Sequence, residues 1–110
     1  MSKQKQLGAV NTPYGVGTLM QREYGNGALA LTVEPHICTV SVNLAHGQPC
    51  LQSDELPEGH FYVDTNNLSG ELIAALRESG FMAPTELPEG VSGYCTYPVW
   101  KLVAQHSPAA

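Results

Sequence analysis

A metal site in this chain would draw on imidazole and thiolate side chains, the ligands that zinc prefers, and the candidates are His36, Cys38, His46, Cys50, His60 and Cys95. Their spacing gives two loose pairs, His36 with Cys38 and His46 with Cys50, and no CxxC pair. Cys38 also shares its strand face with Val40, Val42 and Leu44, which is typical of a thiol packed as a small hydrophobe. We therefore predict no metal and no cofactor, and keep zinc as a minor alternative.

Acid–base or nucleophilic catalysis would use a second group of residues. Glu58, His60 and Asp64 lie near one expected strand and could share a cleft, as a small metal-dependent or acid/base enzyme requires. Asp64 is explained more simply by an Asx-type turn before a helix. Cys95 has no nearby cation except Lys101 to lower its pKa. We predict a protein that is not an enzyme, with the acid/base enzyme as an alternative.

The most informative pattern is a duplication of five residues. Glu55–Gly59 reads Glu-Leu-Pro-Glu-Gly, and Glu86–Gly90 repeats it unchanged. Proline and glycine in these places favour turns, so both copies are expected to be solvated acidic turns that lead into strands.

Negative charge is concentrated around this duplication. The formal net charge is −5, and from Asp54 to Glu89 Arg77 is the only lysine or arginine, against eight acids: Asp54, Glu55, Glu58, Asp64, Glu71, Glu78, Glu86 and Glu89. Such a surface repels nucleic-acid phosphate and attracts basic protein surfaces. We therefore expect a protein partner and no direct contact with nucleic acid.

Aromatic residues near the end of the chain suggest a recognition surface, because tyrosine and tryptophan dominate interface hot spots. Tyr97 and Trp100 would project to opposite faces of a regular strand, so at least one belongs to the core. Pro98 cannot donate to a ladder, which indicates an edge or a bulge, and such an edge could pair with a second copy in a homodimer. The predicted partner-binding residues are Asp54, Glu55, Glu58, Glu86, Glu89, Tyr97 and Trp100.

Turn signals and apolar periodicity define the elements that must position these residues. Thr12–Gly15 and the Asn-Gly pair in Gly25–Gly27 predict two hairpins. Ser69 as N-cap and Gly80 as C-cap residue predict a helix over about 70–79. Alternating or β-branched runs predict strands over 28–33, 37–44, 61–63 and 92–103.

These elements predict an α+β fold, a twisted, mainly antiparallel sheet of about five to six strands with one amphipathic helix packed on it. With 110 residues, the chain should form a single compact domain over 1–110, with flexible tails at 1–6 and 107–110. No apolar run approaches membrane-spanning length and no signal peptide follows the basic start, so we expect a cytoplasmic protein with reduced cysteines.

Three strings in the second half of the sequence are Thr39–Leu44, Phe61–Asn67 and Ser92–Trp100. They resemble strings in an uncharacterised family of small bacterial proteins found on plasmids, other mobile elements and chromosomes. The family has no established activity, so the resemblance implies a context and no catalytic residue. In that context we expect an anti-CRISPR-like inhibitor whose carboxylates occupy the nucleic-acid groove of a defence complex. A dimeric structural or regulatory adaptor that uses Tyr97 and Trp100 is a further alternative.

Overall fold

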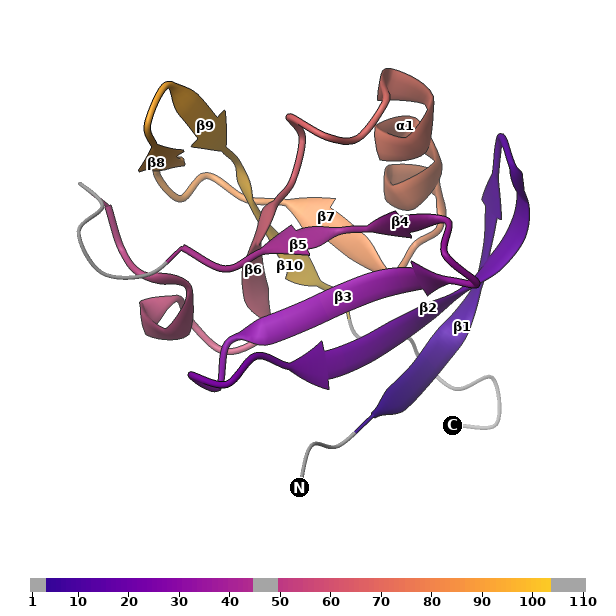
Figure 1. Cartoon of the computed structure of the whole chain (residues 1–110), viewed down its shortest axis with the longest axis horizontal. Helices are drawn as coiled ribbons and strands as arrows, with labels where there is room; N and C mark the ends of the chain where they lie inside the picture. Colours follow the sequence, from indigo (N-terminus) through magenta and orange to yellow (C-terminus); the bar gives the residue numbers. More distant parts are fainter. Residues whose placement is uncertain (1–3, 45–49, 104–110) are drawn as a thin grey trace.

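Within residues 4–44 and 50–103, which the computed structural model describes, the chain forms ten β-strands, one α-helix and one 3-10 helix (Figure 1). The first antiparallel sheet has the order β1 (Lys5–Thr12), β2 (Gly15–Glu23), β3 (Leu29–Glu34), β4 (Cys38–Thr39). The second has the order β5 (Ser41–Val42), β6 (His60–Val63), β10 (Val99–Leu102), β7 (Met82–Pro84). The remaining elements are the hairpin of β8 (Gly90–Ser92) and β9 (Cys95–Tyr97), the 3-10 helix η1 (Ser53–Glu55) and the helix α1 (Gly70–Glu78).

The α+β class is confirmed, but the prediction of one sheet of five to six strands is wrong. The chain changes sheets at Val40, the single residue between β4 and β5. The Val40 N–H donates to the Leu31 carbonyl of β3 at 2.8 Å, whereas the Val40 carbonyl accepts from the Asp64 N–H, just after β6, at 2.9 Å. One segment therefore pairs with β3 through its first half and with β6 through its second half.

Both predicted hairpins of the first sheet are present. β1 and β2 pair as far as Thr12 opposite Gly15, and β2 and β3 pair from Glu23 opposite Leu29. At the second turn, the Asn26 side chain accepts from the Ala28 N–H at 3.1 Å. The predicted flexible tail at 1–6 overlaps β1, because Lys5 pairs with Gln21. Residues 1–3 and 107–110 lie outside the described residues.

The predicted helix and its caps are also confirmed. The Ser69 hydroxyl accepts from the Leu72 N–H at 3.1 Å, and Gly80 follows the helix with a φ of 83°. The helix packs against β1 and β7, the terminal strands of the two sheets. Its buried face joins the main core, whose members are Val10, Leu19, Leu31, Val33, Val40, Phe61, Val63, Leu68, Leu72, Leu76, Met82 and Trp100.

The strand predicted over 92–103 is divided at Pro98 into β9 and β10, and the edge that this proline indicated is found for β9, which pairs with β8 alone, but not for β10. β10 lies in the interior of the second sheet, between β6 and β7. Pro98 precedes the strand, and its carbonyl accepts from the Val63 N–H at 2.9 Å. The missing proline N–H therefore costs no ladder bond inside β10. No helix among the described residues is long and apolar enough to cross a membrane.

Candidate functional site

The two copies of Glu-Leu-Pro-Glu-Gly meet on one small apolar cluster. Leu56 of the first copy and Leu87 of the second both pack against the buried side chains of Leu44, Tyr62 and Val99. In both copies the leucine is half-buried while the proline and both glutamates are exposed. The duplication therefore places two leucines inward on the same cluster and four glutamates outward.

The first copy forms the turn that its sequence predicts. The His60 N–H donates to the Pro57 carbonyl at 3.0 Å, and Gly59 has a φ of 79°. A positive φ at the third of four residues is the arrangement of a type II turn, which favours glycine. Glu58 stands at the turn's exposed second position, directly before β6.

The second copy follows a different backbone course from the expected turn. It bends at Glu86 and Leu87 and then enters β8, of which Gly90 is the first residue. Gly90 is buried, and a Cβ placed on it would lie 2.5 Å from Tyr62 Cε1 and 2.6 Å from Leu44 Cδ1. Glycine is thus needed here for close packing, whereas Gly59 is needed for its backbone conformation.

The 3-10 helix η1 overlaps the first copy at Glu55 and adds one further carboxylate, Asp54. The Glu55 side chain accepts from the Gln52 N–H at 2.8 Å, which caps this short helix. The buried Ser53 hydroxyl accepts from the Leu44 N–H at 2.6 Å and donates to the Val42 carbonyl at 3.2 Å. These bonds fix η1 to the end of β5, and they leave Asp54 and Glu55 exposed.

An apolar hollow of about 240 Å³ separates the two acidic copies. Its lining residues are Cys50, Leu51, Leu56, Tyr62, Leu87, Pro88 and Glu89. The Cys50 thiol joins the two sides, because Sγ lies 3.3 Å from the Val91 N–H donor and 3.7 Å from the Val91 carbonyl. Leu51 is 50% exposed at this hollow and adds to its apolar surface.

Tyr62 forms the floor of the same hollow. It is 1% exposed, and its hydroxyl donates to the Leu51 carbonyl at 2.7 Å. Burial raises the pKa of Tyr62 to about 12, with smaller contributions from Cys50 and Glu55. The phenol therefore stays neutral at physiological pH and acts as a fixed, hydrogen-bonded support.

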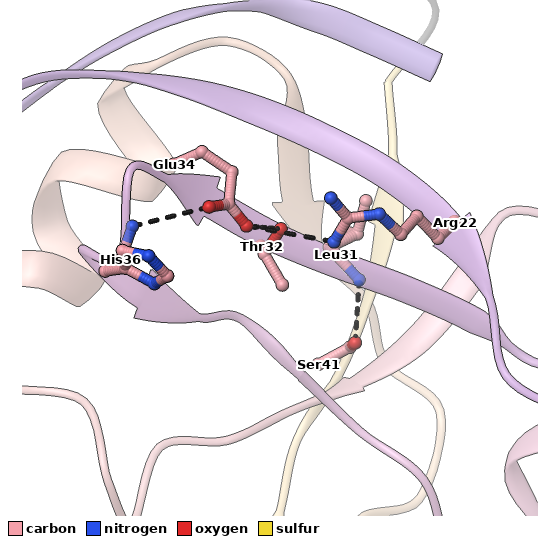
Figure 2. A network of polar contacts seen from close by, with 6 residues as sticks. All are labelled: Arg22, Leu31, Thr32, Glu34, His36 and Ser41. Atoms are coloured by element: carbon pink, nitrogen blue, oxygen red, sulfur yellow. Dashed lines mark hydrogen bonds and ion pairs between the residues drawn. The ribbon is translucent and has the colours of Figure 1, made fainter. Parts of the chain in front are cut away.

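The carboxylates at this end of the molecule have no neutralising partner in the described part of the chain. The ion pair within residues 4–44 and 50–103 joins Arg22 and Glu34 at 3.7 Å, in the polar network of Figure 2. All five predicted acidic binding residues are exposed: Asp54, Glu55, Glu58, Glu86 and Glu89. Their charge is therefore available to a partner.

The predicted aromatic residues separate. Trp100 is 4% exposed and belongs to the main core, between Phe61 and Pro84 in the sheet. Tyr97 is half-buried against the apolar cluster of the acidic end, and burial raises its pKa. Tyr94, absent from the predicted binding set, is fully exposed at the tip of the β8–β9 hairpin. The Gly at position 93, with a φ of 63°, was the available sequence signal for that turn.

The residues of the enzyme alternative do not come together. Glu58 and His60 line a hollow beside the β2–β3 turn, whereas Asp64 lies beyond the other end of β6, in a separate groove. The Asp64 carboxylate accepts two hydrogen bonds from the Asn67 side-chain amide, at 3.0 and 3.1 Å, and the turn itself is closed by the Asn67 N–H on the Asp64 backbone carbonyl.

Zinc ligands do not converge either. Among the residues that the structure describes, no three His, Cys, Asp or Glu side chains are grouped to hold a metal ion. Cys38, Cys50 and Cys95 are unpaired, and burial raises the pKa of the Cys38 thiol. His46 lies outside the described residues.

Comparisons with known proteins find no matching family model, no matching curated protein and no matching solved structure. The resemblance noted from the sequence therefore stays a hypothesis, and the functional argument depends on the geometry of the acidic end.

Proposed function

We propose that this protein is a non-enzymatic binding module whose acidic end docks on a basic surface of a partner protein. The observation that carries this proposal is the meeting of the two Glu-Leu-Pro-Glu-Gly copies on one apolar cluster. Of the exposed carboxylates in and beside these copies, Glu89 lines the hollow of mainly leucine and proline between them, and Asp54 and Glu58 line a second hollow beside the β2–β3 turn.

This arrangement has the anatomy of a protein interface, an apolar centre with a polar rim. Lysine and arginine carry long aliphatic stems that can cover apolar surface while their charged heads meet carboxylates. Leu51, Leu56 and Leu87 would contact such stems, and the rim carboxylates would contact the heads. Rim charges of this kind chiefly accelerate association and select the partner.

The β8–β9 hairpin extends this acidic surface with an aromatic side chain. Its base is fixed by Cys50 against Val91, and the Asn66 amide donates to the Thr96 carbonyl at 3.1 Å. Tyr94 at its tip is free to stack on an arginine of the partner, a contact worth about 0.5–1 kcal/mol at an exposed site.

Basic grooves that hold DNA or RNA are the partner surfaces that fit this charge best. The resemblance to proteins of mobile elements supports a bacterial defence complex as the source of such a groove. The proposed activity is therefore inhibition of a CRISPR-type complex by occupation of its nucleic-acid groove.

The test uses a purified CRISPR effector complex without bound DNA, and measures binding of the protein and its competition with target DNA. The variant Glu58→Gln/Glu89→Gln neutralises one exposed carboxylate in each copy. The control Glu71→Gln/Glu78→Gln makes the same charge change on the exposed face of α1. With about 0.2–1 kcal/mol for each rim contact, the first variant should bind roughly 2- to 30-fold more weakly.

The control should bind as tightly as the wild type. Equal weakening of both variants would show that only bulk charge matters, and the role of the two copies would be rejected. Binding that leaves DNA competition intact would reject occupation of the groove.

A further inference from the structure

A groove of about 820 Å³ lies beside β4, away from the acidic end. Its walls come from the β1–β2 turn, the β3–β4 turn and the start of α1, which lie together at one side of Figure 1. The lining residues that matter to the argument are Tyr14, Ile37, Thr39, Asp64, Leu68 and Leu72. Its volume lies within the range of roughly 300–1,000 Å³ that is typical of ligand-binding clefts.

The groove exists because β6 leaves the sheet early. After the Asp64 N–H bonds to the Val40 carbonyl, the chain turns away, and the Asn67 and Leu68 N–H groups both donate to the Asp64 carbonyl, at 3.1 and 3.2 Å. β4 is consequently a terminal strand of its sheet. The place beside β4 where β6 would have continued is open.

The backbone of Thr39 faces this opening. Thr39 pairs with Thr32, and the Val40 N–H bonds to the Leu31 carbonyl directly beyond that pair. In an antiparallel ladder, a pair bracketed in this way is the non-hydrogen-bonded kind, so both backbone groups of Thr39 point away from β3. An exposed edge with an outward N–H and carbonyl is a template for one more strand.

We propose that this groove binds an extended peptide segment of a partner protein, added as a strand antiparallel to β4. The peptide backbone would exchange hydrogen bonds with Thr39, and an apolar side chain would rest on Leu68 and Leu72. Among the residues that the structure describes, Asp64 and His36 line the groove and no lysine or arginine does, so the peptide should carry a basic residue beside that apolar one.

The far wall of the groove selects a single chain as the occupant. Residues of the segment from Asn67 to Leu72 line the groove together with β4. A second copy of the protein would bring neighbouring strands along with its own edge strand, and these would collide with that segment. Affinity would come from the side-chain contacts, and the short edge would set direction and register.

The β3–β4 turn that forms one wall is held in place before any peptide arrives. The Glu34 carboxylate accepts from the Thr32 hydroxyl at 2.9 Å and from the His36 N–H at 3.4 Å, and Arg22 lies 3.7 Å away (Figure 2). A wall that is already ordered reduces the entropy lost on binding. The groove shares no lining residue with the hollow between the acidic copies, so this proposal stands or falls independently of the proposed function.

The test starts from a random heptapeptide display library selected against the full chain. Selected peptides should alternate apolar and other residues and include a lysine or arginine. Fluorescence polarisation then compares Thr39→Pro with Thr39→Ala, because proline removes the outward N–H and is tolerated at an edge strand, whereas alanine keeps it. Thr39→Pro should weaken binding at least tenfold, and Thr39→Ala by no more than threefold.

A second measurement leaves the protein unchanged, in case Thr39→Pro fails to fold. Each amide of the selected peptide is N-methylated in turn, which removes one donor at a time. Strand addition predicts that alternate positions lose affinity and the positions between them do not. A library that yields no binder, binding unaffected by Thr39→Pro in a folded variant, or an N-methyl scan without alternation would overturn the proposal.

Discussion

Replacing Gly90 by alanine tests whether close packing, rather than turn conformation, explains the glycine of the second acidic copy. The added Cβ would lie 2.5 and 2.8 Å from Tyr62 Cε1 and Cζ, and 2.6 Å from Leu44 Cδ1. Carbon atoms normally approach to about 3.5–4.0 Å, so each neighbour would have to move by about 1 Å.

Those neighbours have little freedom to move. Tyr62 is 1% and Leu44 4% exposed, and the Tyr62 hydroxyl is bonded to the Leu51 carbonyl at 2.7 Å. Overpacking of this kind costs about 1–3 kcal/mol. We therefore expect Gly90→Ala to lower the free energy of unfolding by about 2 kcal/mol, which moves the urea midpoint by about 1 M for a slope of about 2 kcal/mol/M.

The first copy supplies a matched control, because nothing lies within 4 Å of a Cβ on Gly59 and its φ is 79°. Alanine at position 59 suffers left-handed strain of about 1–2 kcal/mol, which asparagine partly relieves. Urea unfolding followed by circular dichroism should thus show that Gly59→Asn is more stable than Gly59→Ala, but that Gly90→Asn is less stable than Gly90→Ala. In a Leu44→Val background, which removes Cδ1, the cost of Gly90→Ala should fall. An unchanged midpoint for Gly90→Ala, or the same ranking at both positions, would refute the packing argument.

Three further predictions concern stability. Burial raises the pKa of Tyr62 to about 12, so the folded state holds this proton after the unfolded chain has lost it. As pH rises from about 10 to 12, the free energy of unfolding of the wild type should therefore fall by about 2 kcal/mol relative to that of Tyr62→Phe. Urea titration at each pH measures this difference. The hydrogen bond from the Thr32 hydroxyl, and after it that from the His36 N–H, lowers the pKa of the Glu34 carboxyl. The wild type should therefore be more stable than Glu34→Gln above the carboxyl's ordinary pKa, and this advantage should disappear as pH falls through the lowered pKa. Acid titration curves of stability that run parallel for the two proteins would contradict this. Ser69→Ala removes the cap of α1 and should cost about 1 kcal/mol, whereas Ser69→Asp should retain most of the stability in thermal unfolding.

Local signals in the sequence were sufficient for elements whose bonds are local. Ser69 and Gly80 define α1 through contacts within four residues, and the Asn-Gly pair defines the β2–β3 turn through the bond from Asn26 to Ala28. The exposure of the glutamates in both copies also follows from their charge. The exposure of these acidic side chains could therefore be predicted residue by residue, while their role in binding stays a prediction.

The parts of the fold that were predicted wrongly depend on hydrogen bonds and contacts between residues that are separated in the sequence. Nothing local in the sequence at Val40 shows that its N–H belongs to one sheet and its carbonyl to another, because the partners Leu31 and Asp64 are distant in the chain. Pro98 indicated an edge, yet its carbonyl and not its absent N–H makes the contact with β6. In the second copy, Gly90 begins a strand and packs closely against Tyr62. The sequence of the motif, which is identical in the two copies, cannot reveal this contact.

The segment that changes sheets also joins the two proposed binding surfaces. At one end Thr39 borders the groove, and at the other Leu44 exchanges hydrogen bonds with Ser53, which carries η1 and its carboxylates. Six residues of nearly extended chain thus run from one surface to the other. This segment is hydrogen-bonded to β3 and to β6, and its Val40 and Ser41 are buried, so it holds the two surfaces at a fixed separation.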